Sequence, residues 1–118
     1  MIYLASPYSH ADAEVEADRF RQVCAKTAEI MRSGRMVFSP IAHSHPVMKH
    51  SDGGVGGDWE SWARFDVWFI ARCDELWVLM LDGYEESVGV QKEVYYAKSI
   101  GKAVRYITAE EAFDVDPA

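Results

Sequence analysis

Apolar runs and helical stripes alternate along the chain, and their order predicts its secondary structure. Short apolar, β-rich runs predict strands at residues 1–6, 35–40, 75–81 and 103–107. Apolar residues at helical spacing predict helices over residues 11–33, around residues 59–70 and from about residue 87 onward. A capping-box pair, Thr108 and Glu111, predicts a short last helix. The segment at residues 41–57, rich in His and Gly, is predicted to be a loop.

Strands that alternate with helices predict an α/β fold, with a doubly wound parallel sheet of four to five strands and helices on both faces. We expect one domain to span residues 1–118. Such sheets bind ligands beyond the carboxyl ends of their strands, so we expect ligand contacts from the loops at residues 6–10, 41–57 and 82–87. The sequence has neither a Gly-x-Gly-x-x-Gly segment after the first strand nor a Walker-type loop, which argues against dinucleotide and nucleoside-triphosphate sites.

Two helical stripes each contain a carboxylate where an apolar contact is expected. Glu93 lies three residues after Val90 and four before Ala97 on one stripe. Asp66 interrupts the other stripe, which is formed by positions 59, 62, 63, 67 and 70. An unpaired buried carboxylate is costly, so each acid must be neutral, hydrogen-bonded or at the wall of a cavity. Either acid alone is compatible with a structural role, as the partner of an Arg or the cap of a loop, but a pair in one pocket is the arrangement that commonly breaks glycosidic bonds.

The helix that contains Glu93 begins with residues suited to binding an anion. Ser87 is a good N-cap residue, and Gly89 lets a ligand approach the free N–H groups of the first turn. Ser87 alone could simply cap its own helix. Ser87 and Glu93 are six residues apart, which is about 9 Å along a helix axis. This separation suits a ligand with a phosphate at one end and a reacting carbon at the other, such as a nucleoside monophosphate.

Composition and charge narrow the class of protein. The chain is 49% hydrophobic and 13% aromatic, which indicates a globular fold. Its formal net charge of −7 argues against nucleic-acid duplexes and anionic membranes as default partners. The chain has no apolar run of membrane-spanning length and no signal-peptide pattern, so we expect a cytoplasmic protein. Cys24 and Cys73 each fall in a helix-like apolar pattern, which favours free thiols over a disulfide.

The His-rich loop and two tryptophans each allow more than one interpretation. His43 and His45 follow the second predicted strand and could contact a ligand, lie in a solvated loop or hold a metal. The spacing of these histidines matches no standard zinc pattern. Trp59 and Trp62 lie on a helical stripe, which favours a place in the core over stacking on a base.

Three segments resemble the nucleoside 2-deoxyribosyltransferase superfamily: IYLASPYS near the start, DVWFIARCDELWVLML in the middle and SVGVQKEVYYAKSIGK near the end. The last segment matches the superfamily's Gly-x-x-x-Glu-x-x-x-Ala-x-x-x-Gly-Lys pattern at Gly89, Glu93, Ala97, Gly101 and Lys102. Within the superfamily, the chain is similar to a small bacterial and phage group with a PYS loop and an FSPI-x-H-x-H sequence. The resemblance implies a flavodoxin-like fold, no metal and no organic cofactor.

The resemblance also implies roles for individual residues. Glu93 matches the nucleophile that attacks C1′ of the deoxyribose, Asp66 matches the acid near the base, and Tyr3 matches the tyrosine that contacts the nucleophile. Ser87 matches a Ser of the related deoxynucleoside 5′-monophosphate N-glycosidases, whose hydroxyl donates to phosphate. Transferases of unphosphorylated nucleosides commonly have Asp at this position, and an Asp would repel a phosphate dianion. The loop SPYSH lacks the Gly-rich, Arg-containing sequence of these glycosidases. Further substrate contacts are expected from Gly89, Ser6, Tyr8, His43 and His45.

We therefore expect an enzyme that cleaves the N-glycosidic bond of a 2′-deoxynucleoside 5′-monophosphate through Glu93, by hydrolysis or base transfer. The alternatives are base exchange on unphosphorylated nucleosides and a non-catalytic nucleotide-binding module. The expected partner is a small-molecule nucleoside or nucleotide, not a nucleic acid or a membrane. We also expect a homo-oligomer, a dimer or tetramer. Superfamily members often complete their sites with a neighbouring subunit, and Trp68 and Phe69 fall off the core stripe of their helix, where exposed aromatic side chains favour a partner.

Overall fold

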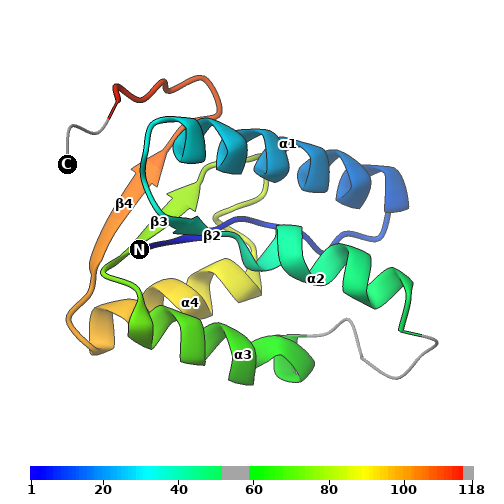
Figure 1. Cartoon of the computed structure of the whole chain (residues 1–118). Coiled ribbons are helices and arrows are strands. Elements are labelled where there is room, and N and C mark those ends of the chain that lie inside the picture. Colours follow the sequence, from blue (N-terminus) through cyan, green and yellow to red (C-terminus); the bar gives the residue numbers. More distant parts are fainter. Residues whose placement is uncertain (52–58, 116–118) are drawn as a thin grey trace.

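The sheet consists of parallel strands in the order β2-β1-β3-β4 (Figure 1). The computed structural model describes residues 1–51 and 59–115. Within them the strands are β1 (Ile2–Ala5), β2 (Val37–Phe38), β3 (Glu75–Leu79) and β4 (Ala103–Ile107). The register pairs Tyr3 with Phe38 of β2 and with Leu76 of β3. This strand order confirms the predicted α/β fold, because it is the order of a flavodoxin-like doubly wound sheet.

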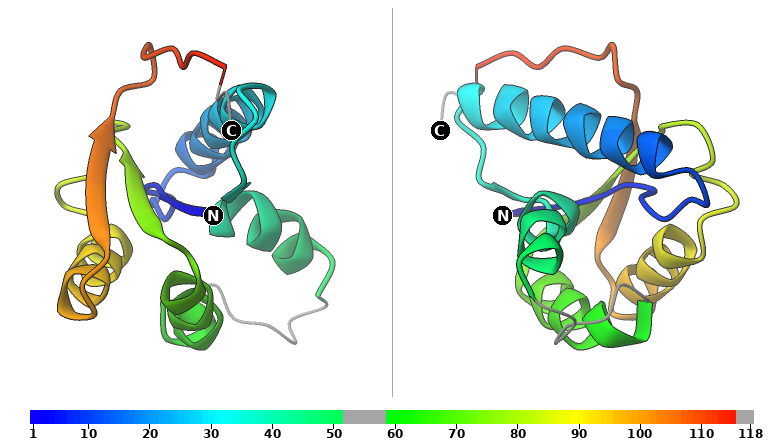
Figure 2. Two further views of the ribbon diagram at one scale, coloured as in Figure 1. Left: turned by 60° about the vertical axis from the view of Figure 1, so that its left-hand side comes forward. Right: turned by 90° about the vertical axis from the view of Figure 1, so that its right-hand side faces the viewer.

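Helices cover both faces of the sheet (Figure 2). Helix α1 (Ala13–Arg32) packs on one face, and α3 (Trp59–Arg72) and α4 (Val88–Ser99) pack on the other. Successive side chains of a strand point to opposite faces. In β1, therefore, Ile2 and Leu4 pack toward α1, whereas Tyr3 and Ala5 pack toward α3 and α4. Each face thus has its own apolar cluster, and a side chain of β1 that points toward α3 and α4 can reach polar groups on both of those helices.

The bounds of α1 agree closely with the predicted helix over residues 11–33. Asp12 caps its start, since the side chain accepts a hydrogen bond of 2.9 Å from the N–H of Glu14. Its end is followed by Gly34, whose φ of 91° is a conformation that glycine adopts without strain.

Cys24 and Cys73 are both free thiols, as predicted. No helix in the described ranges is long and apolar enough to cross a membrane.

The prediction of a loop over residues 41–57 is wrong for its first part, which forms helix α2 (Pro40–Lys49). Ser39 is its N-cap and accepts a hydrogen bond of 3.1 Å from the N–H of Ala42. Pro40 occupies the first turn, where a missing N–H is harmless. The two histidines and the internal Pro46 hid the helical pattern, although Ser-Pro is a good start signal for a helix. Residues 52–58 of the predicted loop lie outside the described residues.

The short last helix predicted from Thr108 and Glu111 is not formed in residues 108–115. The hydroxyl of Thr108 does accept a hydrogen bond of 3.1 Å from the N–H of Glu111. However, a capping box also needs the Glu side chain to return to the N-cap N–H. The Glu111 carboxylate instead pairs with Arg105 at 2.5 Å, so only half of the box is made and a single turn results.

Candidate functional site

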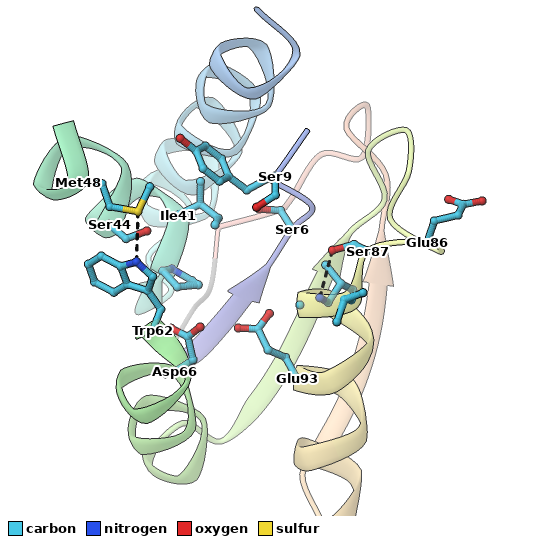
Figure 3. A pocket seen from close by; sticks show the side chains of 15 residues that line it. Ser6, Ser9, Ile41, Ser44, Met48, Trp62, Asp66, Glu86, Ser87 and Glu93 are labelled. Atoms are coloured by element: carbon cyan, nitrogen blue, oxygen red, sulfur yellow. Dashed lines mark hydrogen bonds between the residues drawn. The ribbon is translucent and has the colours of Figure 1, made fainter. Parts of the chain in front are cut away.

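A pocket of about 380 Å³ opens at the carboxyl ends of β1 and β3 (Figure 3). This is where the strand order of a doubly wound sheet reverses and where such folds bind ligands. Its walls come from the loop after β1, from α2, from α3 and from the start of α4. The lining residues are Ser6, Tyr8, Ser9, Pro40, Ile41, Ser44, Met48, Trp62, Asp66, Glu86, Ser87, Val88, Gly89, Val90 and Glu93. All three loop regions expected to contact a ligand contribute to it.

Tyr3, Asp66 and Glu93 meet at one wall, each from a different element. The Tyr3 hydroxyl donates a hydrogen bond to Oε2 of Glu93. The carboxyl groups of Asp66 on α3 and Glu93 on α4 point toward each other (Figure 3). A hydrogen-bonding interaction between them affects the pKa of both. Tyr3 is fully buried and Glu93 is only 7% exposed. The two acids that interrupted the helical stripes therefore form one hydrogen-bonded pair, and no Arg pairs with either in the described residues.

Burial shifts the protonation of this cluster. It raises the pKa of Glu93 well above the usual 4.5; the negative charge of Asp66 raises it further, and the hydrogen bond from Tyr3 opposes the change. Burial also raises the pKa of Asp66 from 3.8 to about 6, against the hydrogen bonds from Glu93 and Tyr3 and the charge of His43. The pKa of Tyr3 is raised by burial and by both carboxylates, so its hydroxyl keeps its proton. The pair therefore holds a proton near neutral pH, because two negative charges in one site would repel each other.

The opposite end of the pocket offers hydrogen-bond donors from the start of α4. The Ser87 side chain caps the helix, accepting a hydrogen bond of 3.2 Å from the N–H of Val90, so the structural interpretation of Ser87 is correct. Capping uses the hydroxyl as an acceptor and leaves its proton free to donate. Within the described ranges, nothing accepts from the N–H groups of Val88 and Gly89. These three donors and the helix dipole favour an anion.

Ser6 adds a further polar group from the other side of the pocket. Its side chain follows β1 and is only 5% exposed. Its hydroxyl has no hydrogen-bond partner in the parts of the chain that the structure describes. A buried hydroxyl without a partner is unfavourable, so a polar group of a ligand is the natural partner for this one.

The wall formed by α2 and α3 is mostly apolar and aromatic. The Trp62 indole N–H donates to Sδ of Met48 at 3.2 Å, which fixes the ring beside the pocket (Figure 3). Trp62 is half-buried and lines the pocket, so its predicted place in the core is wrong. The stripe itself contained the signal, because Trp62 lies one helical turn before Asp66 and must face the same way. The side chain of Trp59 lies outside the described residues.

His43 and His45 do not line the pocket, whereas Ser44 between them does. Because α2 is a helix, consecutive side chains point in different directions, which a loop prediction could not anticipate. Nδ1 of His45 lies 2.5 Å from the Tyr8 hydroxyl, and its ring packs against Phe20. Tyr8 does line the pocket, so His45 supports a lining residue from behind. Within the described ranges, no group of three or more His, Cys, Asp or Glu side chains is placed to hold a metal ion.

Among the lining residues that the sequence did not single out, Ser44 and Met48 carry a recognisable signal. They lie four residues apart, so they share one face of a helix once α2 is recognised. Glu86 lies at the rim beside Ser87 and is exposed. Among the described residues, the pocket lining includes the acids Asp66, Glu86 and Glu93 and no Lys, Arg or His.

A protein-family model described as a domain of unknown function (DUF1937) matches residues 1–109, so the chain belongs to this family. No curated protein matches the chain. The family description assigns no activity, and the geometry of the pocket is therefore the basis for a functional proposal.

Proposed function

We propose that this protein cleaves the N-glycosidic bond of a 2′-deoxynucleoside 5′-monophosphate, with Glu93 as the nucleophile. The observation that carries the proposal is the Asp66–Glu93 pair, in which Glu93 is buried and Asp66 half-buried. Tyr3 holds Glu93 in place, and the pair lies at the middle of a pocket with an aromatic wall on one side and a helix N-terminus on the other. Two carboxyl groups in one pocket supply both a nucleophile and an acid, which is what the cleavage of a glycosidic bond needs.

The order of side chains along the pocket matches the order of groups in a nucleotide. Trp62 and Met48 form an apolar wall for the base next to Asp66, Glu93 lies at the centre, and Ser87 lies at the far end (Figure 3). A ligand that places its base on Trp62 would present C1′ to Glu93. Its 5′-phosphate would then reach the donors of α4 and the Ser6 hydroxyl.

The shared proton gives the pair a way to prepare both roles at once. Glu93 attacks only as a carboxylate, and the free pair keeps its proton because both pKa values are raised. Transfer of the proton from Glu93 to Asp66 gives an attacking carboxylate and a neighbouring acid in a single step. Glu93 then forms a bond to C1′ while the C1′–N bond breaks, and its electron pair goes to the base nitrogen, which takes the proton from Asp66. Water or a second base releases the sugar from Glu93.

A second candidate is base exchange on unphosphorylated nucleosides, and the charge of the pocket favours it. No described lining residue is basic, and Glu86, which precedes Ser87 at the rim, adds a negative charge near that end although its carboxylate points away from the pocket (Figure 3). A phosphate dianion would therefore depend on neutral donors alone, whereas a 5′-hydroxyl would need no cation. The two candidates differ in one measurable quantity, the preference for the 5′-phosphate.

The test is the release of free base from a panel of deoxynucleosides and their 5′-monophosphates, with affinities measured in parallel. Charge-assisted hydrogen bonds contribute about 1.5–3 kcal/mol each, so the monophosphate is expected to bind roughly ten- to a hundredfold better than its nucleoside. Ser87→Asp should reverse that preference by repulsion, and Ser87→Ala should weaken it less because the backbone donors remain.

Three outcomes of this test separate the candidates. Better binding of the unphosphorylated form by the wild type would refute the phosphate assignment in favour of the second candidate. Tight binding without base release would indicate a non-catalytic nucleotide-binding module. Failure of every compound to bind would refute the proposal as a whole.

A further inference from the structure

Arg19 joins two loops that form opposite walls of the pocket. From α1, its Nη1 donates to the backbone carbonyl oxygens of Tyr8 at 3.3 Å and Ser9 at 3.0 Å, in the loop after β1. Its Nη2 donates to the carbonyl oxygen of Asp82 at 2.9 Å, in the loop between β3 and α4 and 63 residues from Arg19 in sequence. The guanidinium thus bridges two segments that are far apart in the chain. We call this arrangement the Arg19 clasp.

The neighbouring backbone is shaped to admit this guanidinium. Gly83 has a φ of +90°, a conformation that L side chains rarely adopt. A Cβ atom on Gly83 would lie 2.6 Å from Nη2 of Arg19, closer than nonbonded atoms approach. Any other residue at this position would therefore strain the loop and push the guanidinium away from the Asp82 carbonyl.

The Arg19 clasp acts on the pocket from outside. Arg19 does not line the pocket, and the partners of its hydrogen bonds are neutral carbonyl groups. No carboxylate in the described part of the chain forms an ion pair with it. A planar guanidinium with donors on two arms holds several acceptors in fixed directions, which a Lys ammonium on a flexible stem does not.

The two loops that Arg19 joins carry the two halves of the anion-binding end of the pocket. Ser6 belongs to the loop after β1, and Ser87 with the free N–H groups of Val88 and Gly89 follows the loop after β3. A ligand group that contacts both halves needs them at a fixed separation. We propose that Arg19 is a positioning residue that sets this separation and thereby the preference of the pocket for a 5′-phosphate. The proposal rests on the proposed function, since it identifies the anion as the phosphate of the substrate.

The first test needs no ligand and uses the full chain. Amide hydrogen exchange is compared between the wild type and Arg19→Lys in peptides covering residues 6–10 and 82–91. The second peptide includes the Tyr84 and Glu86 N–H groups, which donate within the loop to Leu81 and Gly83. Exchange in both peptides is expected to rise about tenfold or more, because the two loops lose one shared tether. Unchanged exchange in either peptide would overturn the clasp.

The matched control is Arg21→Lys, two residues along the same helix. Arg21 is exposed and pairs only with Asp18 at 3.4 Å among the described residues, so its replacement should leave both peptides unchanged. Gly83→Ala disturbs the clasp from the other loop. Its effect on exchange should overlap with that of Arg19→Lys, so that the double variant exceeds either single variant by little.

The second test measures affinity for deoxyadenosine and its 5′-monophosphate, together with the other deoxynucleotide pairs of the panel. Arg19→Lys should weaken the monophosphate about tenfold and the nucleoside by no more than about twofold, because only the phosphate needs both halves. Arg19→Gln should weaken the monophosphate as much as Arg19→Lys does, because the proposal assigns the effect to the geometry of the guanidinium and not to its charge. An equal loss for both ligands would mean a merely structural role and would overturn the proposal. If the wild type binds neither ligand, the proposed function fails, and the exchange experiment alone decides whether the clasp exists.

Discussion

Asp66→Asn is expected to stabilise the folded protein at about pH 8, although it removes a member of the candidate active site. Burial raises the pKa of Asp66 from 3.8 to about 6. An acid whose pKa is higher in the folded than in the unfolded chain stabilises the fold while it holds its proton. This contribution is complete below the unfolded pKa of 3.8 and is lost as the pH rises through about 6. Above that pH the wild type carries a buried charge, whereas the amide of the variant stays neutral.

The size of the expected gain in stability follows from the shift in the pKa of Asp66. One pKa unit corresponds to about 1.4 kcal/mol, so the change from 3.8 to about 6 amounts to about 3 kcal/mol. Domains of this size are stable by roughly 5–15 kcal/mol, so the variant should unfold at a clearly higher temperature, by roughly 10 °C. Asn keeps the shape of the side chain and one acceptor oxygen for the proton of the Glu93 carboxyl group. The difference between variant and wild type should therefore be small at about pH 4 and should grow to its full size above about pH 7.

Urea unfolding followed by tryptophan fluorescence, at a series of pH values, measures this difference. Asp82→Asn is the matched control, because it makes the same chemical change at an exposed carboxylate and should shift stability by less than about 0.5 kcal/mol at every pH. A difference that does not change with pH would show that Asp66 does not titrate in this range. A wild type more stable than Asp66→Asn at alkaline pH would mean that Asp66 has a favourable ionic partner, which is the structural interpretation of a buried acid.

Further expectations concern catalysis and assembly. Glu93→Gln should fold normally and lose at least about a thousandfold of base-release activity, since covalent catalysis loses its attacking group; near wild-type rates would remove Glu93 from the mechanism. Asp66→Asn should slow base release most for the poorest leaving groups, and equal slowing for good and poor ones would count against Asp66 as the acid. A homodimer or larger assembly remains our prediction, because Phe65, Trp68 and Tyr95 on α3 and α4 are 55%, 51% and 78% exposed. Light scattering at micromolar concentration would detect it, and a monomer there would end this idea.

The acid pair could be predicted from the sequence because it contradicts a strong pattern. Asp66 and Glu93 each occupy an apolar stripe, and the stripe itself fixes the direction of the side chain. Two helices on the same face of a parallel sheet then bring the acids together. The same argument placed Ser87 at the start of its helix, where the cap is observed. For these residues, the position along a helix was therefore sufficient to predict where the side chain lies.

Other parts of the site depend on contacts that no local pattern records. Helix α2 was missed because His and Pro residues obscure its apolar face, and with it the lining residues Ser44 and Met48. Phe69 was expected to be exposed like Trp68, but it stacks on Phe38 at 4.0 Å between ring centroids. The bonds of Arg19 go to backbone carbonyls far away in sequence, and no residue type marks a carbonyl as an acceptor. These features follow from how the elements pack, which the order of residues alone does not give.

Two features of the site meet one requirement, which is that no cation lowers the pKa values of the acid pair far enough to remove its proton. No Lys, Arg or His is among the described residues that line the pocket, and Arg19 lies behind the loops, outside the pocket. The charge of His43 lowers the pKa of Asp66 by less than burial raises it. A cation within about 4–6 Å of the pair would lower both pKa values and remove the proton that the proposed chemistry moves from Glu93 to Asp66. Hydroxyl and N–H donors attract an anion without carrying a full charge, so they can share a pocket with the pair. Arg19 organises those donors through neutral carbonyl groups outside the pocket. A phosphate bound there would add negative charge and favour retention of the shared proton, so ligand binding and acid catalysis would support each other.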